Sequence, residues 1–255
     1  MTLQTISIEV SPRAVATVLL NRPERGNAFD QRMLDELAEQ FALLGTDENV
    51  RIVVLRGSGR HFCTGADLAA RTADASKGKS APATLRDVLL ALDGLPKPTV
   101  AVVHGGAIGG GAAFVACCDV ALAADAAFFS IPEVRVGMAP LGVMPFLVRA
   151  MGHRSFRRYG LSGERIAAAE ALRFGLVHRI CEEAALEDTL ARLCDDLLHG
   201  APGALATLKA AAAEFASPKL SAIKNWRPPH EPRTAEAAEG VASFREKRKP
   251  KWYPP

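Results

Sequence analysis

A glycine-rich stretch, His104–Phe114, carries the residues whose types and spacing point most directly to chemistry. Five glycines fall in seven positions between the apolar run Val100–Val103 and a second apolar segment that begins at Phe114. Glycine allows close approach to the main chain, and the first turn of a helix presents unpaired N–H groups. Such groups bind an anion, either a phosphate or an oxyanion formed during a reaction. A tight packing turn is the alternative, but it explains three consecutive glycines poorly.

Glu133 is the candidate proton-transfer residue. It stands in the apolar segment Phe128–Val134, where loss of water should raise the pKa of its carboxyl and favour acid–base work. The alternative is a structural glutamate that pairs with Arg135 or caps a turn. His104 and Asp119 are expected to act structurally, the histidine through a local hydrogen bond and the aspartate as a cap or buried acceptor.

The elements that must position these groups alternate along the chain. Strands are predicted by four short β-branched or apolar runs, Val15–Leu20, Arg51–Leu55, Thr99–Val103 and Asp119–Ala123. Between the first two, apolar residues recur at helical spacing from Met33 to Leu44, and Asp30 can cap the start of that helix. Alternation of strands and helices predicts an α/β fold with largely parallel pairing. The small and polar segment 71–83 is expected to be a loop near a site.

The character changes towards the C-terminus, where helices are predicted at Leu186–Leu198, Gly203–Phe215 and Thr234–Lys247. A connector with four prolines is expected at 217–232. We therefore predict a core with the ligand site at residues 1–195 and a C-terminal helical region at 196–255. The last helix has little core of its own, so it is expected to pack on the main domain or on a sister subunit.

Bulk properties exclude several classes of protein. The 255 residues carry a net charge of +3, too small to argue for nucleic-acid binding, so no nucleic acid is expected. No charge-free apolar run has the length of a membrane span, and no secretion signal is seen, so no membrane contact and a cytoplasmic location are expected. The five cysteines lack paired spacing, which favours reduced core thiols, and no metal site is predicted.

Motifs in register over nearly the whole chain resemble the enoyl-CoA hydratase/isomerase (crotonase) superfamily. They are Leu20–Pro23 with Asn27–Phe29, His61–Leu68, the glycine stretch with Cys118–Asp119, Pro132–Gly137, Leu161–Arg165 with Ala169–Val177, and Glu239–Pro250. The sequence around these motifs most resembles bacterial 3-methylglutaconyl-CoA hydratase-like members. The resemblance implies an α/β spiral of ββα units, a C-terminal helical region for trimerisation, and a homotrimer or homohexamer. It also implies an acyl-CoA substrate bound as its coenzyme A thioester, with no further cofactor.

The same resemblance assigns roles to residues. The backbone N–H groups of Ala66 and Gly110 would bind the thioester oxygen, and Glu133 would act as acid/base. Coenzyme A would contact a further set: Arg25, Ala28, Asp67, Leu68, Gly109, Phe244 and Lys247. Asp67 would shape the turn and the purine pocket, and Arg71 is an additional candidate for the phosphates. A lysine usual in the family after Asp67-Leu68 is replaced by Ala69, which implies rearranged phosphate contacts.

One departure from the family separates the possible reactions. Hydratases of the superfamily usually carry a second glutamate three residues after the oxyanion glycine, where this chain has Ala113. The chain is therefore expected to be a lyase that hydrates a straight-chain or branched 2-enoyl-CoA with Glu133 alone. The alternatives are a Δ3,Δ2-enoyl-CoA isomerase, an acyl-CoA decarboxylase, or a non-catalytic protein of this fold that binds acyl-CoA or RNA.

Overall fold

The computed structural model describes residues 3–69, 82–216 and 234–248. The predicted loop 71–83, apart from its last two residues, and the predicted connector 217–232 lie outside the described residues. Arg71 lies outside them as well. The strands are β1 Ile6–Val10, β2 Val15–Leu20, β3 Ile52–Gly57, β4 Thr99–Val103, β5 Gly106–Ile108, β6 Val120–Ala124, β7 Phe128–Ser130, β8 Ile166–Ala167 and β9 Arg179–Cys181.

Nine helices and three short 3-10 turns are assigned in the described part of the chain. They are α1 Gln31–Thr46, α2 Leu85–Asp93, α3 Gly110–Cys117, α4 Met144–Met151, α5 His153–Ser162, α6 Ala168–Arg173, α7 Leu186–Leu198, α8 Pro202–Ala216 and α9 Thr234–Arg245, with short 3-10 turns η1 Pro23–Arg25, η3 Glu133–Val136 and η4 Glu183–Ala185. The predicted boundary between residues 195 and 196 falls inside α7, and the division into two domains stays a prediction.

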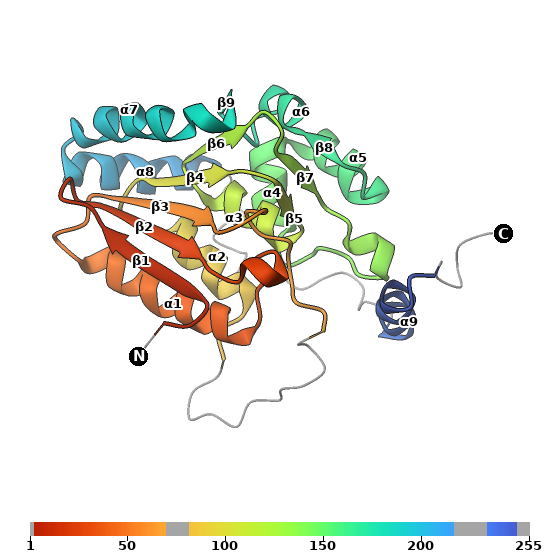
Figure 1. Cartoon of the computed structure of the whole chain (residues 1–255). Coiled ribbons are helices and arrows are strands. Elements are labelled where there is room, and N and C mark those ends of the chain that lie inside the picture. The colour runs from red at the N-terminus through yellow and green to blue at the C-terminus, as the bar shows by residue number, and fades with distance from the viewer. Residues whose placement is uncertain (1–2, 70–81, 217–233, 249–255) are drawn as a thin grey trace.

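The larger sheet has the strand order β1-β2-β3-β4-β6-β9 (Figure 1). Its β1–β2 pair is antiparallel, whereas the pairs from β2 to β9 are parallel. The prediction of largely parallel pairing is thus confirmed, and two predicted strands, β2 and β4, have the predicted bounds. In Figure 1, α1 and α2 lie on one side of this sheet and α7 and α8 on the other.

A smaller sheet, with the order β5-β7-β8, lies beside the first. From β4 onward the chain repeats one pattern: a strand of the large sheet, a strand of the small sheet, then a helix. The units β4-β5-α3 and β6-β7-α4 follow it. Part of the glycine stretch is a strand that the sequence did not predict, because Gly106–Ile108 forms β5 and pairs in parallel with Phe128–Ser130.

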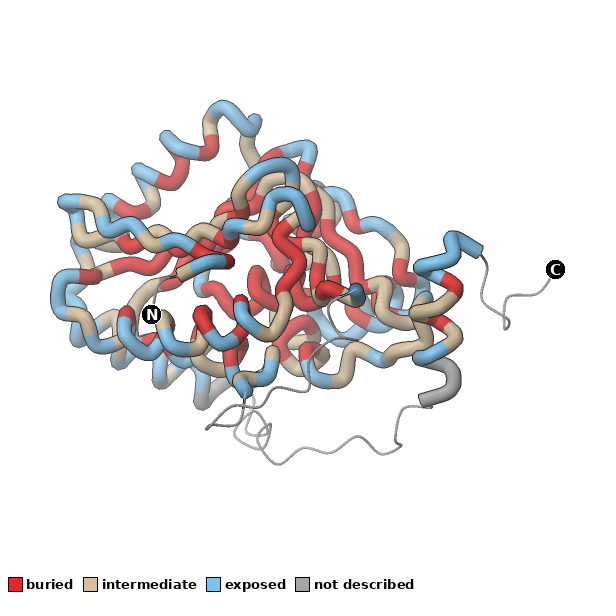
Figure 2. Tube along the Cα trace, turned by 60° about the horizontal axis from the view of Figure 1, so that its bottom comes forward, coloured by how far each residue is buried: buried red, intermediate tan, exposed pale blue. Residues whose placement is uncertain are grey.

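The core fills the space between the sheets and their helices (Figure 2). Five phenylalanines are fully buried in it: Phe41, Phe62, Phe114, Phe129 and Phe146. α1 contributes the predicted apolar stripe from Met33 to Leu44, and Asp30 caps it by accepting a hydrogen bond from the Met33 N–H at 2.9 Å. In contrast, every residue of α3 is buried, because this helix runs through the interior.

The last helix, α9, packs on the η3 turn of the same chain. Gly240 comes so close to Val136 that a Cβ at residue 240 would lie 2.1 Å from the Val136 carbonyl oxygen. The side chain of Arg245 donates a hydrogen bond to the Leu68 carbonyl oxygen at 2.6 Å. The described part of α9 thus packs on the main domain, which is one of the two arrangements predicted from the sequence. Within the described ranges, no helix is both long enough and apolar enough to cross a bilayer.

Candidate active site

Gly109 forms the turn between β5 and α3. Its backbone angles, φ 55° and ψ −116°, belong to a region that residues with a Cβ rarely adopt. Its N–H donates to the Ser130 carbonyl oxygen at 2.8 Å, which ties the turn to β7. A Cβ at residue 109 would lie 2.6 Å from Glu133 Oε1. The carboxyl group of Glu133 therefore lies directly over the face of this glycine.

Gly110 is the first residue of α3, so its N–H has no acceptor within the helix. A Cβ at residue 110 would approach the Phe29 ring to 2.6 Å and Leu85 Cδ2 to 3.1 Å. The Gly110 nitrogen also lies 3.9 Å from the position that a Cβ on Gly65 would take. The chain segment around residue 65 and the start of α3 are thus in contact, although 45 residues separate them in sequence.

Ala66 lies on the segment that faces Gly110. The segment is held by two isolated bridges, Cys63 with Ala107 and Ala66 with Phe29. The second bridge uses the Gly65 carbonyl and the Asp67 N–H, each at 2.9 Å from its Phe29 partner. Within the described ranges, no hydrogen bond uses the N–H of Ala66 or of Gly110 as its donor. Two backbone donors without a protein acceptor can bind an oxyanion of a ligand.

Glu133 begins η3, and its Oε2 atom is buried without a hydrogen-bond partner in the described part of the chain. Burial raises the pKa of this carboxyl, against a smaller opposing effect of its own backbone N–H. The expected direction is therefore confirmed. The alternative of an ion pair with Arg135 is wrong, because the Arg135 guanidinium instead donates to the Ser162 carbonyl oxygen at 3.1 and 3.2 Å.

Ala113 is fully buried, one helical turn after Gly110. Its N–H donates to the Gly109 carbonyl oxygen at 3.1 Å, an ordinary helical bond. A methyl group at this position offers no proton to transfer. The site therefore has one carboxyl group from η3 and none from this position of α3.

The remaining predicted ligand contacts fall in two groups. Ala28, Asp67 and Leu68 lie together: Arg22 donates to the Ala28 carbonyl and forms an ion pair with Asp67 at 3.1 Å, and the Leu68 carbonyl accepts from Arg245. Arg25, Phe244 and Lys247 are exposed, the first on η1 and the others near the end of α9. Their contacts with coenzyme A stay predictions.

Arg22 was overlooked as an organising residue, although it lies inside the motif Leu20–Pro23. It also approaches Asp30 at 3.4 Å, so one guanidinium joins the start of α1, Ala28 and Asp67. The pattern of charges gave no signal for this role, because Ala28 accepts through its backbone carbonyl and Asp67 lies 45 residues from Arg22 in sequence. The sequence signal was its place between a strand end and a proline.

His104 and Asp119 make their contacts with segments other than the glycine turn at Gly109. His104 Nε2 pairs with the Gly59 carbonyl at 2.7 Å, as expected of a structural histidine, although the partner is distant in sequence. Asp119 accepts from the N–H and hydroxyl of Thr99, and it pairs with Lys209 at 2.7 Å. It is an acceptor as predicted, but its side chain is one-third exposed rather than buried.

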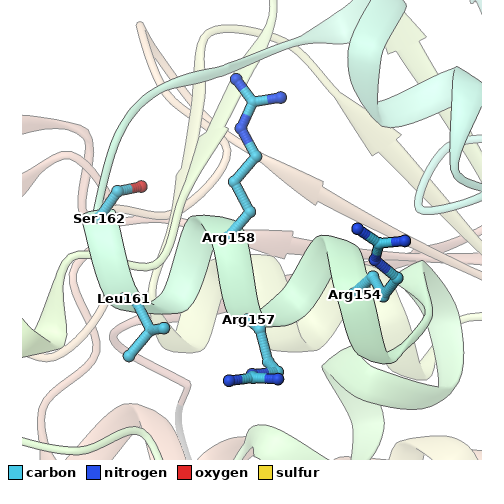
Figure 3. Close-up of a pocket in the computed structure, with 5 residues that line it drawn as sticks. All are labelled: Arg154, Arg157, Arg158, Leu161 and Ser162. Atoms are coloured by element: carbon cyan, nitrogen blue, oxygen red, sulfur yellow. The ribbon is translucent and has the colours of Figure 1, made fainter.

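Two hollows lie on the surface, and no predicted site residue lines either of them. One, of about 420 Å³, lies on α5 beside Arg154, Arg157, Arg158, Leu161 and Ser162. Figure 3 shows its arginines projecting in different directions, so they do not converge on one ligand. The other, of about 630 Å³, is lined in part by His61, His104 and Arg165. The guanidinium of Arg165 already lies over the Phe128 ring, 3.5 Å from its centroid.

Comparisons with known proteins agree with this architecture. Residues 11–254 match the model of the family described as enoyl-CoA hydratase/isomerase. A crystal structure of an enoyl-CoA hydratase from Mycobacterium avium subsp. paratuberculosis K-10 superposes with a TM-score of 0.84, at 27% identity over 99% of this chain and 100% of that chain. A monofunctional enoyl-CoA isomerase from M. smegmatis gives a TM-score of 0.72, at 30% identity over 88% of this chain and 99% of that one.

Two relatives extend the comparison to sequence. Enoyl-CoA hydratase AKT6-1 of Alternaria alternata is 33% identical over 91% of this chain and 78% of its own length. The (E)-benzylidenesuccinyl-CoA hydratase of Thauera aromatica is 35% identical over 81% of each chain. The chain belongs to the enoyl-CoA hydratase/isomerase family and has the crotonase fold. It is an enzyme of this family, and its substrate class is acyl-CoA.

Proposed function

We propose that this enzyme adds water across the double bond of a 2-enoyl-CoA thioester, and that Glu133 moves the protons. The observation that supports the proposal best is the orphaned, buried Oε2 of Glu133 over Gly109, next to the first N–H groups of α3. A carboxyl with a raised pKa is a stronger base when it is ionised. It is also a usable acid after it has accepted a proton.

In the proposed reaction, the N–H groups of Ala66 and Gly110 bind the thioester oxygen. Glu133 takes a proton from water as the water oxygen bonds to C3, and the electrons of the C2–C3 double bond pass to the thioester oxygen as an enolate. The two amides stabilise this charge, and one such donor is worth about 3–4 kcal/mol. The enolate then re-forms the carbonyl as C2 takes the proton from Glu133, so one carboxyl group serves both steps.

The test is incubation with crotonyl-, 3-methylcrotonyl-, 3-methylglutaconyl- and a 3-enoyl-CoA, with the products read by mass. A gain of one water from a 2-enoyl substrate supports hydration. Glu133→Gln should reduce turnover by about 10²–10⁴ while binding of saturated butyryl-CoA stays unchanged. Turnover that survives this substitution would refute the role of Glu133.

Isomerisation of a 3-enoyl-CoA to the 2-enoyl isomer is the second candidate. One observation favours it: Ala113 leaves a single carboxyl group, and one base suffices to carry a proton between C2 and C4. The likeness to a monofunctional isomerase points the same way. In the thioester panel this reaction gives a product of unchanged mass and shifted retention, so the two candidates separate in one experiment.

A homotrimer or homohexamer without a bound cofactor is the assembly that we propose. The exposed Phe244 of α9, and Lys247 just beyond its end, would then contact the coenzyme A of the same or a neighbouring subunit. Light scattering coupled to size-exclusion chromatography measures the assembly directly, and a monomer would contradict the proposal.

A further inference from the structure

Two residues hold the buried side-chain polar atoms that have no hydrogen-bond partner in the described part of the chain. Glu133 leaves Oε2 unpaired, and Arg86 leaves Nε and Nη2 unpaired. Buried polar groups are rarely left without a partner, so each exception needs a reason. The proposed reaction explains Glu133 and does not explain Arg86.

Arg86 belongs to a helix whose first residue packs against the candidate active site. It is the second residue of α2, and the first, Leu85, is the side chain that a Cβ on Gly110 would meet at 3.1 Å. One stripe of α2 carries Arg86, Leu90 and Asp93 at helical spacing. Asp93 pairs with Arg149 of α4, so the stripe faces the side on which α4 lies. α4 follows the η3 turn that carries Glu133, and α3 contacts both α2 and α4.

Among the described residues, no carboxylate forms an ion pair or a hydrogen bond with Arg86, and the neighbouring Asp87 interacts with its charge only at longer range. The adjacent carboxylate, Asp87, is exposed and completes a capping box with the N–H and hydroxyl of Thr84. Asp93, on the same stripe, already pairs with Arg149. A guanidinium stays charged at any ordinary pH, and burying two of its nitrogens without a partner is costly. Its planar fork of N–H donors matches the two oxygens of a carboxylate.

We propose that Arg86 binds a carboxylate at the far end of the acyl group, so that the preferred substrate is the CoA monothioester of an unsaturated dicarboxylic acid. The inference rests on the proposed function for the place of the thioester oxygen, at Ala66 and Gly110. Arg86 is then a specificity-determining residue. The acyl chain, and not the nucleotide, is the part of the substrate next to Gly110, which favours an acyl carboxylate over a coenzyme A phosphate.

The test compares ligands that differ only in the distal charge. Dissociation constants are measured for glutaryl-CoA and for its distal primary amide, with the full-length wild type, Arg86→Met, Arg86→Lys and the control Arg157→Met. Arg157 is an exposed arginine of α5, so its substitution removes the same charge from the surface. Turnover of glutaconyl-CoA and crotonyl-CoA is measured in parallel.

Arg86→Met should weaken glutaryl-CoA binding by about 30-fold or more and leave the amide unaffected. Arg86→Lys should restore part of the loss, because it keeps the charge without the fork. Arg157→Met should change neither ligand. Equal weakening of both ligands by Arg86→Met would overturn the proposal in favour of a phosphate contact or a structural role, and so would a wild type without preference for glutaryl-CoA. Failure to hydrate either enoyl thioester, with the binding preference intact, would instead refute the proposed hydration alone.

Discussion

Glu36 and Glu133 are both shielded from water, but they differ in their hydrogen bonding and in the direction of their pKa shifts. Glu36, on α1, is 6% exposed and accepts hydrogen bonds from the N–H of Gln4 and from the N–H and hydroxyl of Thr5, at 2.6–3.0 Å. Burial alone would raise its pKa, but these bonds lower the pKa below the ordinary value. Glu133 experiences burial with no such partner at Oε2, and its pKa is raised.

Two arginines, Arg149 on α4 and Arg86 on α2, show the same contrast between a paired and an unpaired charged group. Arg149 of α4 reaches the carboxylate of Asp93 with both of its terminal nitrogens, one of them at 3.0 Å. Arg86, seven residues before Asp93 on the same stripe of α2, has no partner for Nε or Nη2 in the described part of the chain. The satisfied pair joins two helices. The unsatisfied Glu133 lies over Gly109, and Arg86 follows the residue that packs against Gly110; the proposed substrate would supply the missing partners.

The comparison separates stability from function at the level of single side chains. Groups that hold the fold together are saturated by the protein itself, as Glu36 is. Groups that bind a ligand destabilise the unliganded protein, because a buried polar atom without a partner has lost its hydrogen bonds to water and gained none from the protein. Substitution should therefore weaken the fold at the first kind of group, and weaken activity without weakening the fold at the second.

Gly109→Ala should give the largest effect. The added Cβ would lie 2.6 Å from Glu133 Oε1 and would require φ +55° of a residue with a side chain, so the carboxyl must move. A displacement of this size costs on the order of 100-fold in kcat/KM. Gly203→Ala on α8 is the matched control, because nothing lies within 4 Å of its added Cβ. An active Gly109→Ala enzyme would mean that the turn does not position Glu133.

Glu36→Gln should lower the free energy of unfolding by about 2 kcal/mol, because three donors lose a charged acceptor. The folded variant should keep its kcat, since Glu36 lies on α1 and contacts the N-terminal segment. Urea denaturation measures the first quantity and steady-state kinetics the second. Glu39→Gln, at an exposed position of the same helix, is the control and should be neutral. Loss of activity without loss of stability would break the contrast with Glu133.

Local patterns predicted the elements that carry their own signals. The bounds of β2 and β4 follow from short apolar runs, those of α7 follow from its helical composition, and the Asp30 cap follows from a side chain placed just before a periodic stripe. β5 was missed because Gly106–Ile108 has no β-strand pattern, and its pairing with β7 is decided by the fold. These limits are physical, since a three-residue strand contains too little sequence to show a period.

The candidate site was predictable where its chemistry depends on neighbours in sequence. The raised pKa of Glu133 follows from the apolar residues around it, and the need for glycine at residue 109 follows from the glycine run. The roles of Arg22 and Arg86 depend on long-range contacts or on their absence. Arg22 joins Asp30, Ala28 and Asp67, and Arg86 is notable for having no partner within the described ranges, which no local pattern reveals.

Arg86→Met should stabilise the ligand-free enzyme, by about 1 kcal/mol, because it removes two buried nitrogens, Nε and Nη2, that have no partner. The same substitution abolishes the proposed preference for a carboxylate, so stability and specificity change in opposite directions. Thermal unfolding without ligand, compared with Arg157→Met, measures the effect. A destabilised Arg86→Met protein would show that Arg86 supports the fold and would place it with Arg149.

The pH dependence of stability should differ in sign between the two glutamates. The raised pKa of Glu133 means that the folded state holds its proton more tightly than the unfolded chain. Its contribution to stability is therefore present at low pH and is lost as pH rises from about 4.3 through the folded pKa. Glu36, with a lowered pKa, contributes stability above about pH 4.3 that is lost as pH falls through its folded pKa.

Urea titrations from about pH 4 to pH 8 should show Glu133→Gln gaining stability relative to wild type with rising pH, and Glu36→Gln losing stability relative to wild type. Parallel curves for the two variants would mean that both carboxyls are equally satisfied, and the distinction between a structural and a catalytic glutamate would fail.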